Sequence, residues 1–178
     1  LALVAGAGVT EGGDALLQAG SGVVGGAVLI SGGESEESSG AVVVSSKDAL
    51  TSGRVSIATG AAYSGASGSV LVQTGDAEGS SAGDIVAMAG SSAGGAGGAF
   101  RVTAGSSSFE ESTGGDVELS AGSGTGEQTS GGSVAFRAGA GGEVADGGNV
   151  MLHAGSAGRS GGDMLLTAGA STGEDGGK

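Results

Sequence analysis

A nine-residue motif that recurs along the whole chain constrains its fold more than any other feature. The motif begins with Gly-Gly, Ser-Gly or Ala-Gly, continues as x-Φ-x-Φ-x with Φ an apolar residue, and ends with a small residue and Gly. Its regular copies begin at Gly12, Ser52, Ala82, Gly114, Gly131, Gly147 and Gly161, and looser copies begin at Gly25, Ser39, Ser67 and Gly97. Spacers of four to eight residues separate the copies, which gives a period near 15 residues. A unit this short buries no core of its own, so neighbouring units must stack on one another.

A twelfth copy is divided between the two ends of the chain. Residues 176–178 and 1–6, joined tail to head, give the motif in register with the other copies. We therefore expect residues 1–178 to form a single repeat array that is uncapped at both ends, either a fibre subunit or a stretch of a longer array. An uncapped apolar edge favours pairing with another chain. The predicted head-to-tail interface comprises Leu1, Leu3, Val4, Ala5, Met164, Leu166, Gly176, Gly177 and Lys178.

Inside each copy the apolar residues alternate with period two, which is typical of a half-buried strand. Positions 4, 6 and 8 of the motif are expected to point inward, and the glycine at position 9 is expected to make a turn with positive φ. The spacers are too long for the commonest two-residue hairpins. The predicted fold is therefore all-β, a parallel β-solenoid (β-helix) of about twelve coils. An antiparallel repeat sheet or sandwich stays open as the alternative.

Composition and charge narrow the classes of partner. The chain has 44 Gly and no Pro, Cys or Trp, but its regularly placed Val, Leu and Ile distinguish it from a flexible linker. Its formal net charge is −13, with 19 acidic and 6 basic residues. Nucleic acid is not an expected partner, because neutralising phosphates requires clustered Lys and Arg. No apolar run has the length of a membrane span.

The motif carries no catalytic or cofactor signature, and we expect no enzyme activity and no cofactor. Gly-x-Gly strings such as residues 6–8 neither open a helix nor precede Lys-Ser/Thr, so they do not indicate a phosphate loop. His153 is the only histidine, and without cysteine a His/Cys metal cluster is impossible. Acidic spacer residues such as Glu110 and Glu111 are compatible with weak Ca²⁺ binding, although the motif departs from the calcium-binding nonapeptide. Solvated loops are the simpler interpretation of these acids.

The outward-facing position 5 is apolar in many copies. A contiguous apolar stripe of this kind predicts a lateral interface with another filament or with a second protein. Surface aliphatic residues favoured by strand propensity are the alternative. The stripe comprises Met151, Leu165, Leu16, Leu29, Val43, Leu71 and Val86.

Several spacers are rich in Ser and Thr, which has two interpretations. Exposed hydroxyls are acceptors for O-glycosylation, and a glycan coat would solubilise a fibre. Ordinary turn chemistry is the other interpretation. The candidate acceptors are Ser106, Ser107, Ser108, Ser112, Thr113, Thr129 and Ser130.

In its short period and its Gly/Ala/Ser-rich composition, the chain resembles the β-solenoid repeat arrays of extracellular fibrils and surface adhesins. The resemblance implies a structural subunit of an extracellular filament or surface fibre, located outside the cell or at its surface. Self-association is the expected mode of assembly, with glycans as further partners. An adhesin and an ice- or cation-binding solenoid module are the alternatives. The outward positions lack the regular Thr ranks of ice-binding solenoids, as in the triplet Asp116, Glu118 and Ser120.

Overall fold

The computed structural model describes residues 2–170, and this range contains no helix and no strand. The predicted all-β parallel solenoid is therefore wrong for this structure, and so is the antiparallel sheet or sandwich. A sheet requires a ladder of backbone hydrogen bonds between neighbouring strands. Within residues 2–170, one copy of the motif is joined to the next by a single backbone hydrogen bond at most.

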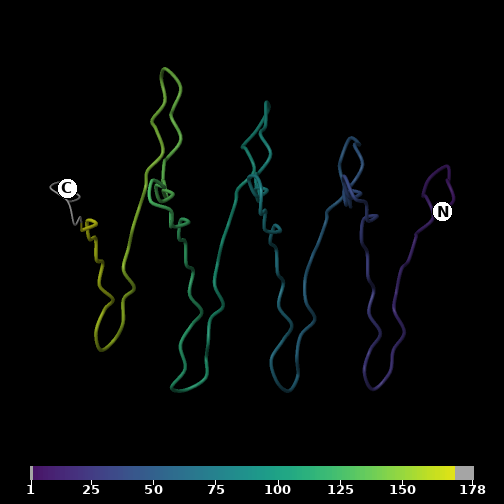
Figure 1. Cartoon of the computed structure of the whole chain (residues 1–178), viewed down its shortest axis with the longest axis horizontal. Coiled ribbons are helices and arrows are strands. Elements are labelled where there is room, and N and C mark those ends of the chain that lie inside the picture. Colours follow the sequence, from purple (N-terminus) through teal and green to yellow (C-terminus); the bar gives the residue numbers. More distant parts are fainter. Residues whose placement is uncertain (1, 171–178) are drawn as a thin grey trace. The chain divides into compact units, whose positions relative to one another are not determined.

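The chain divides into two compact units, Leu1–Ile85 and Val86–Lys178, and the division falls inside the copy at residues 82–90. In each unit, considered by itself, extended segments alternate with loops along the chain (Figure 1). The extended segments are the copies of the motif, and the loops are built around the spacers.

All bends and turns in residues 2–170 fall within spacers. They lie at 9–10, 22–24, 36–37, 49–51, 63–65, 78–80, 93–95, 109–111, 126–128, 143–145 and 158–159. Among the described residues, positive φ occurs only at Gly65 (108°) and Glu111 (60°), which are both spacer residues. The expected positive-φ turn at position 9 is therefore wrong. The spacer reverses the chain by itself, so the position-9 glycines keep ordinary negative φ.

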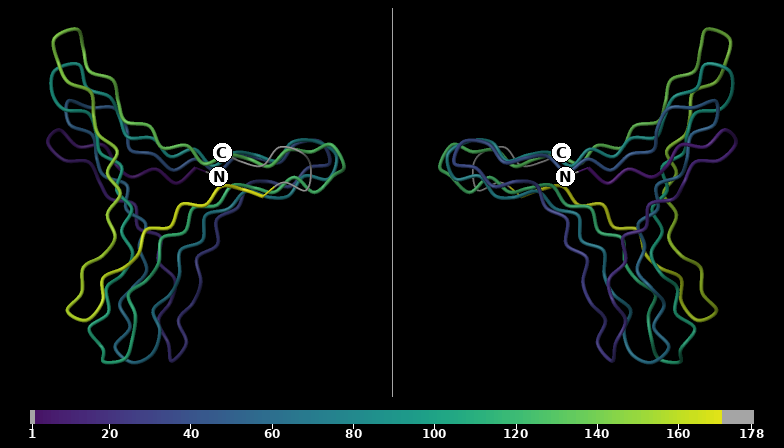
Figure 2. Two further views of the ribbon diagram at one scale, coloured as in Figure 1. Left: turned by 90° about the vertical axis from the view of Figure 1, so that its left-hand side faces the viewer. Right: turned by 90° about the vertical axis from the view of Figure 1, so that its right-hand side faces the viewer.

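The loops follow a regular order of directions. Within each unit the loops point outward in three directions in turn (Figure 2). The two segments that flank a spacer run side by side near the loop, and they then part toward different loops. Consecutive copies thus run side by side over only a few residues, and within residues 2–170 no backbone hydrogen bond joins copies that lie further apart along the chain.

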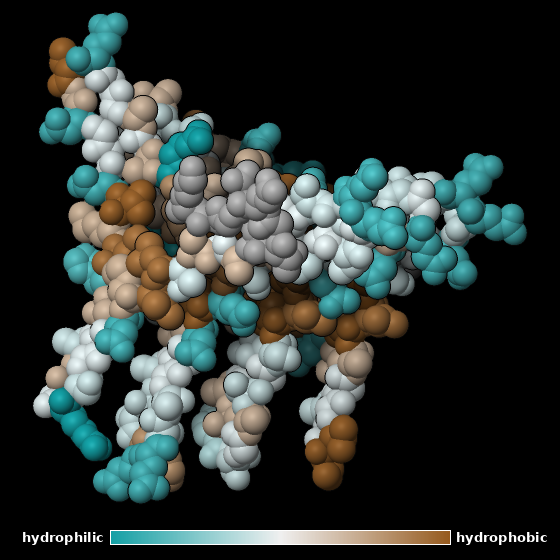
Figure 3. Space-filling view, turned by 60° about the vertical axis from the view of Figure 1, so that its left-hand side comes forward, coloured by the Kyte–Doolittle hydropathy of each residue, from teal (hydrophilic) through white to brown (hydrophobic). Residues whose placement is uncertain are grey.

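The structure has no buried core in the range that it describes. The half-buried residues in that range are Ala5, Ala19, Ala104 and Ala138, and all of them occupy position 8 of the motif. Apolar side chains gather along the motif segments, whereas much of the loop surface is hydrophilic or neutral (Figure 3). The alternation of the sequence is thus expressed in side-chain direction without closing a core.

Candidate functional site

A repeated backbone hydrogen bond, which we call the clasp, closes most of the loops. In each clasp the N–H of the glycine at position 2 donates to the carbonyl oxygen at position 9 of the preceding copy. The N···O distances are 2.8–2.9 Å. In residues 2–170 the donor–acceptor pairs are Gly13–Gly6, Gly26–Gly20, Gly40–Gly33, Gly98–Gly90, Gly115–Gly105, Gly132–Gly122, Gly148–Gly139 and Gly162–Gly155.

Position 2 is glycine in every copy, whereas position 1 also accepts Ser and Ala, and at Gly98 the clasp brings two backbones close together. A Cβ added to Gly98 would lie 3.2 Å from the Cβ of Ala89 and 3.3 Å from both N and O of Gly90. At the neighbouring position 1, a Cβ on Gly97 would lie 3.8 Å from the carbonyl oxygen of Gly90, which is an ordinary contact. The close approach of two backbones thus favours glycine at residue 98, whereas at Gly115, Gly148 and Gly162 the nearest atoms lie at ordinary distances of 3.5–3.6 Å.

The side chain at position 8 separates the closed loops from the open ones. Every clasped loop follows an Ala or Gly at this position, whereas the three loops that lack the clasp follow Ser46, Thr59 and Thr74. The Cγ2 atom of Thr59 lies 3.4 Å from the point that a Cβ on Gly68 would occupy. In the loops after Thr59 and Thr74, the larger side chain occupies the gap between the position-2 N–H and the carbonyl. The loop after Ser46 also differs at position 9, where Lys47 replaces glycine. Sequence reasoning identified position 8 as small, but it missed the distinction between Ala and Thr.

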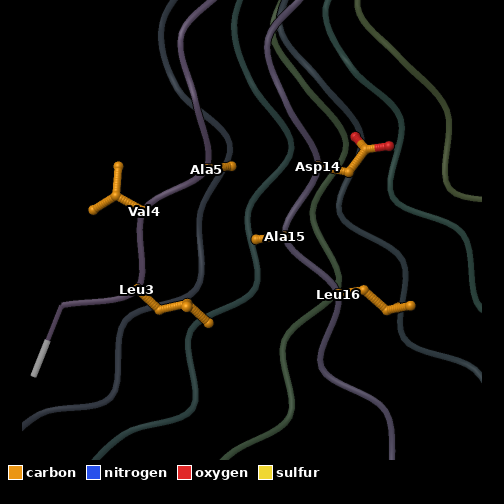
Figure 4. Close-up of a pocket in the computed structure, with 6 residues that line it drawn as sticks. All are labelled: Leu3, Val4, Ala5, Asp14, Ala15 and Leu16. Atoms are coloured by element: carbon orange, nitrogen blue, oxygen red, sulfur yellow. The ribbon is translucent and has the colours of Figure 1, made fainter.

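The first loop shows how side chains are arranged beside a clasp (Figure 4). Leu3 and Ala5 point toward the following segment, and Ala15 points back toward them. Val4 and Leu16 point away from the space between the two segments. Together with Asp14 they line a shallow hollow of about 210 Å³. The even positions of the motif thus face each other across the loop, as the alternation predicts.

The predicted head-to-tail residues are placed only in part. Leu3, Val4 and Ala5 lie together at this hollow. Met164 and Leu166 are exposed residues of the other unit. Leu1, Gly176, Gly177 and Lys178 lie outside the described residues. The head-to-tail interface stays a prediction.

The predicted lateral residues are all exposed, from 69% for Val86 to 91% for Leu29. Among the remaining five, Leu16 borders the first loop and points away from it (Figure 4). The structure thus leaves this set accessible, and the lateral interface also stays a prediction.

Several of the candidate acceptor hydroxyls take part in spacer turns. Ser112 donates its hydroxyl to the carbonyl of Phe109 at 2.8 Å and contacts the hydroxyl of Ser107. The Thr129 hydroxyl accepts from the N–H of Gly126 at 2.8 Å and donates to the carbonyl of the same residue at 2.8 Å. Turn chemistry accounts for these three hydroxyls. In the described part of the chain, the side chains of Ser106, Ser108, Thr113 and Ser130 make no hydrogen bond. O-glycosylation stays a prediction.

The charged residues do not converge on a site. Within residues 2–170, no group of three or more Asp, Glu or His side chains is placed to hold a metal ion. No helix long and apolar enough to cross a membrane is present in that range. Comparison of the chain with protein-family models, with curated proteins and with solved structures gave no match.

Proposed function

We propose that this chain is a structural subunit of an extracellular filament or surface fibre, and that it assembles with copies of itself. One observation carries the proposal, namely the surface that a single chain leaves open. The chain exposes 17847 Å² of accessible surface. A folded monomer of 16.1 kDa would expose about 7,400 Å².

The excess surface cannot be sustained by one chain in water. Ordering a residue costs about 1–2 kcal/mol of backbone entropy, and this cost must be offset mainly by burial of apolar surface. No side chain of the described residues is buried in the single chain. The motif segments must therefore be covered by other chains for this conformation to persist.

The distribution of charge favours a self-assembling structural role. Of the 19 acidic residues, most lie in spacers or at position 3 of the motif, and Glu118 is the only acid between positions 4 and 8. Copies can thus approach through the middle of the motif while the acidic loops face solvent and limit unspecific aggregation.

The extracellular location rests on the resemblance to Gly-rich fibril and adhesin arrays. O-glycosylation of the Ser- and Thr-rich spacers belongs to the same proposal. Intact mass spectrometry of the native material tests it, because a glycan adds mass in steps of one sugar. A mass equal to that of the bare chain would exclude glycosylation.

The assembly itself is tested by sedimentation velocity and electron microscopy over a wide range of protein concentration. We expect circular-dichroism signals of ordered backbone to grow together with oligomer size, and elongated particles to appear at high concentration. A chain that stays monomeric up to millimolar concentration, or that orders fully as a monomer, would refute the proposed function.

A further inference from the structure

The loops are open on both of their faces, although their inner side chains point toward each other. Aliphatic side chains at position 4 are about half exposed, from 48% for Val28 to 59% for Ile85. Those at position 6 are more exposed, from 64% for Val102 to 80% for Ile57. These two positions are apolar in every copy, whereas position 5 includes Ser56, Arg101 and Glu118. The strictly apolar positions are therefore the ones that a partner must cover.

In the described part of the chain, the backbone between positions 3 and 8 of the motif makes no backbone hydrogen bond. In residues 2–170, the backbone hydrogen bonds are the clasps and three bonds inside spacer turns, Ser112 to Phe109, Thr129 to Gly126 and Ala145 to Gly142. In an extended segment, side chains and backbone N–H and C=O groups point in roughly perpendicular directions. When the side chains lie in the plane of the loop, the backbone groups project from its two faces. Rows of unpaired backbone groups are ready to pair with another extended chain.

The glycines at position 9 give independent evidence that a second backbone comes close to the motif. Its glycines have no positive φ, and a Cβ added at Gly60, Gly90 or Gly122 would meet nothing within 4 Å. The same holds for the other described glycines at this position, Gly6, Gly20, Gly33, Gly75, Gly105, Gly139, Gly155 and Gly169. Nothing inside the chain therefore requires glycine there. Glycine occupies this position in every copy except the one at residues 39–47, which has Lys47. A glycine that contacts inside the chain do not require fits a site where a second backbone comes close.

We infer that the occupant of the open loop faces is a second copy of this chain. This inference rests on the proposed function and names the surface through which it acts. The unpaired backbone and the apolar positions recur with a period near 15 residues, and a second copy carries the same spacing. The exposed surface exceeds that of a folded monomer by about 10,000 Å², whereas a standard protein interface buries about 1,600 Å² in total. An assembly of this chain must therefore cover many motif copies at once.

In the inferred contact, the motif segments of one copy lie along those of the other. Positions 4 and 6 pack between the copies, and the unpaired N–H and C=O groups hydrogen-bond across the interface. Position 5 points away from the loop and stays at the periphery. The contact surface thus differs from the predicted lateral stripe, which consists of position-5 residues.

The test compares two neighbouring residues of one motif copy, Leu71 at position 5 and Val72 at position 6, which are 77% and 70% exposed. Sedimentation equilibrium of the full chain measures self-association. We expect Val72→Ser to raise the dissociation constant about tenfold, and Leu71→Ser to raise it less than threefold. A larger effect from Leu71→Ser, in wild-type chains that do associate, would overturn this contact and leave the proposed function in place.

A second measurement does not depend on any variant. Hydrogen–deuterium exchange of the wild-type chain is followed below and above its association concentration. We expect amides at positions 4–7 of the motif to gain protection on association, while amides at the bends of the spacers do not. Protection confined to the spacers would overturn the inferred contact. A wild-type chain that never associates would overturn both the contact and the proposed function.

Discussion

The substitution Gly98→Ala is a direct test of how closely two segments approach at a clasp. The new Cβ would lie 3.2 Å from the Cβ of Ala89 and 3.3 Å from both N and O of Gly90. These contacts are shorter than ordinary van der Waals distances, so the two segments must move apart. The clasp is 2.9 Å long between Gly98 N and Gly90 O, and it weakens as they separate.

The control is Gly97→Ala, at the neighbouring position 1, where the new Cβ would meet the carbonyl oxygen of Gly90 at 3.8 Å. Both substitutions reduce the conformational freedom of the unfolded chain by a similar amount, about 0.4–1 kcal/mol, and this effect cancels in the comparison. The remaining difference between the two variants is therefore the contribution of the clasp. A neutral backbone hydrogen bond contributes about 1 kcal/mol, which corresponds to about a fivefold change in the ratio of open to closed loops.

The assay is amide hydrogen exchange at residue 98, followed by NMR and corrected for the intrinsic exchange rates of Gly and Ala. We expect exchange about fivefold faster in Gly98→Ala than in Gly97→Ala. Exchange at Ser112, whose N–H is bonded within another loop, serves as the internal reference. Equal protection of residue 98 in the two variants would refute the steric account of position 2.

Three further outcomes follow from the same geometry. Thr59→Ala should allow the N–H of Gly68 to reach the carbonyl of Gly60, and exchange at Gly68 should slow severalfold; unchanged exchange would mean that position 8 does not control closure. Thr129→Ala removes the hydroxyl that accepts from the N–H of Gly126, so exchange at Gly126 should accelerate about fivefold, whereas Ser130→Ala should leave it unchanged. Each chain carries a net charge of −13, so raising NaCl from about 0.01 M to about 1 M should screen repulsion between copies and strengthen self-association. Sedimentation equilibrium measures the change, and weaker association at high salt would instead indicate ion pairs between copies.

Some features of the structure could be predicted from the sequence because they depend on neighbours along the chain. The motif and its spacers predict where the backbone is extended and where it bends, since alternating apolar residues and Ser/Gly-rich stretches have local conformational preferences. The direction of side chains in the first loop, with Leu3 and Ala15 facing each other, also follows from simple alternation.

The glycine at position 9 shows where local reasoning fails. The predicted positive φ is absent there, because the bend is made within the spacer and not at the end of the motif. The close packing against Gly98 was equally invisible in the local sequence. It arises from the approach of two segments that a spacer brings together, as between Gly98 and Gly90.

The motif by itself determined the regular alternation of extended segments and loops along the chain. It also determined the two faces of each extended segment. Only the tertiary structure decided that these segments form no sheet, because alternation is the same in a paired strand and in an isolated extended segment. Pairing depends on where other segments lie, and within residues 2–170 the backbone hydrogen bonds join only consecutive copies or residues of one spacer. The closing of each loop likewise depends on a contact across the spacer, where an Ala at position 8 admits the clasp and Thr59 or Thr74 does not.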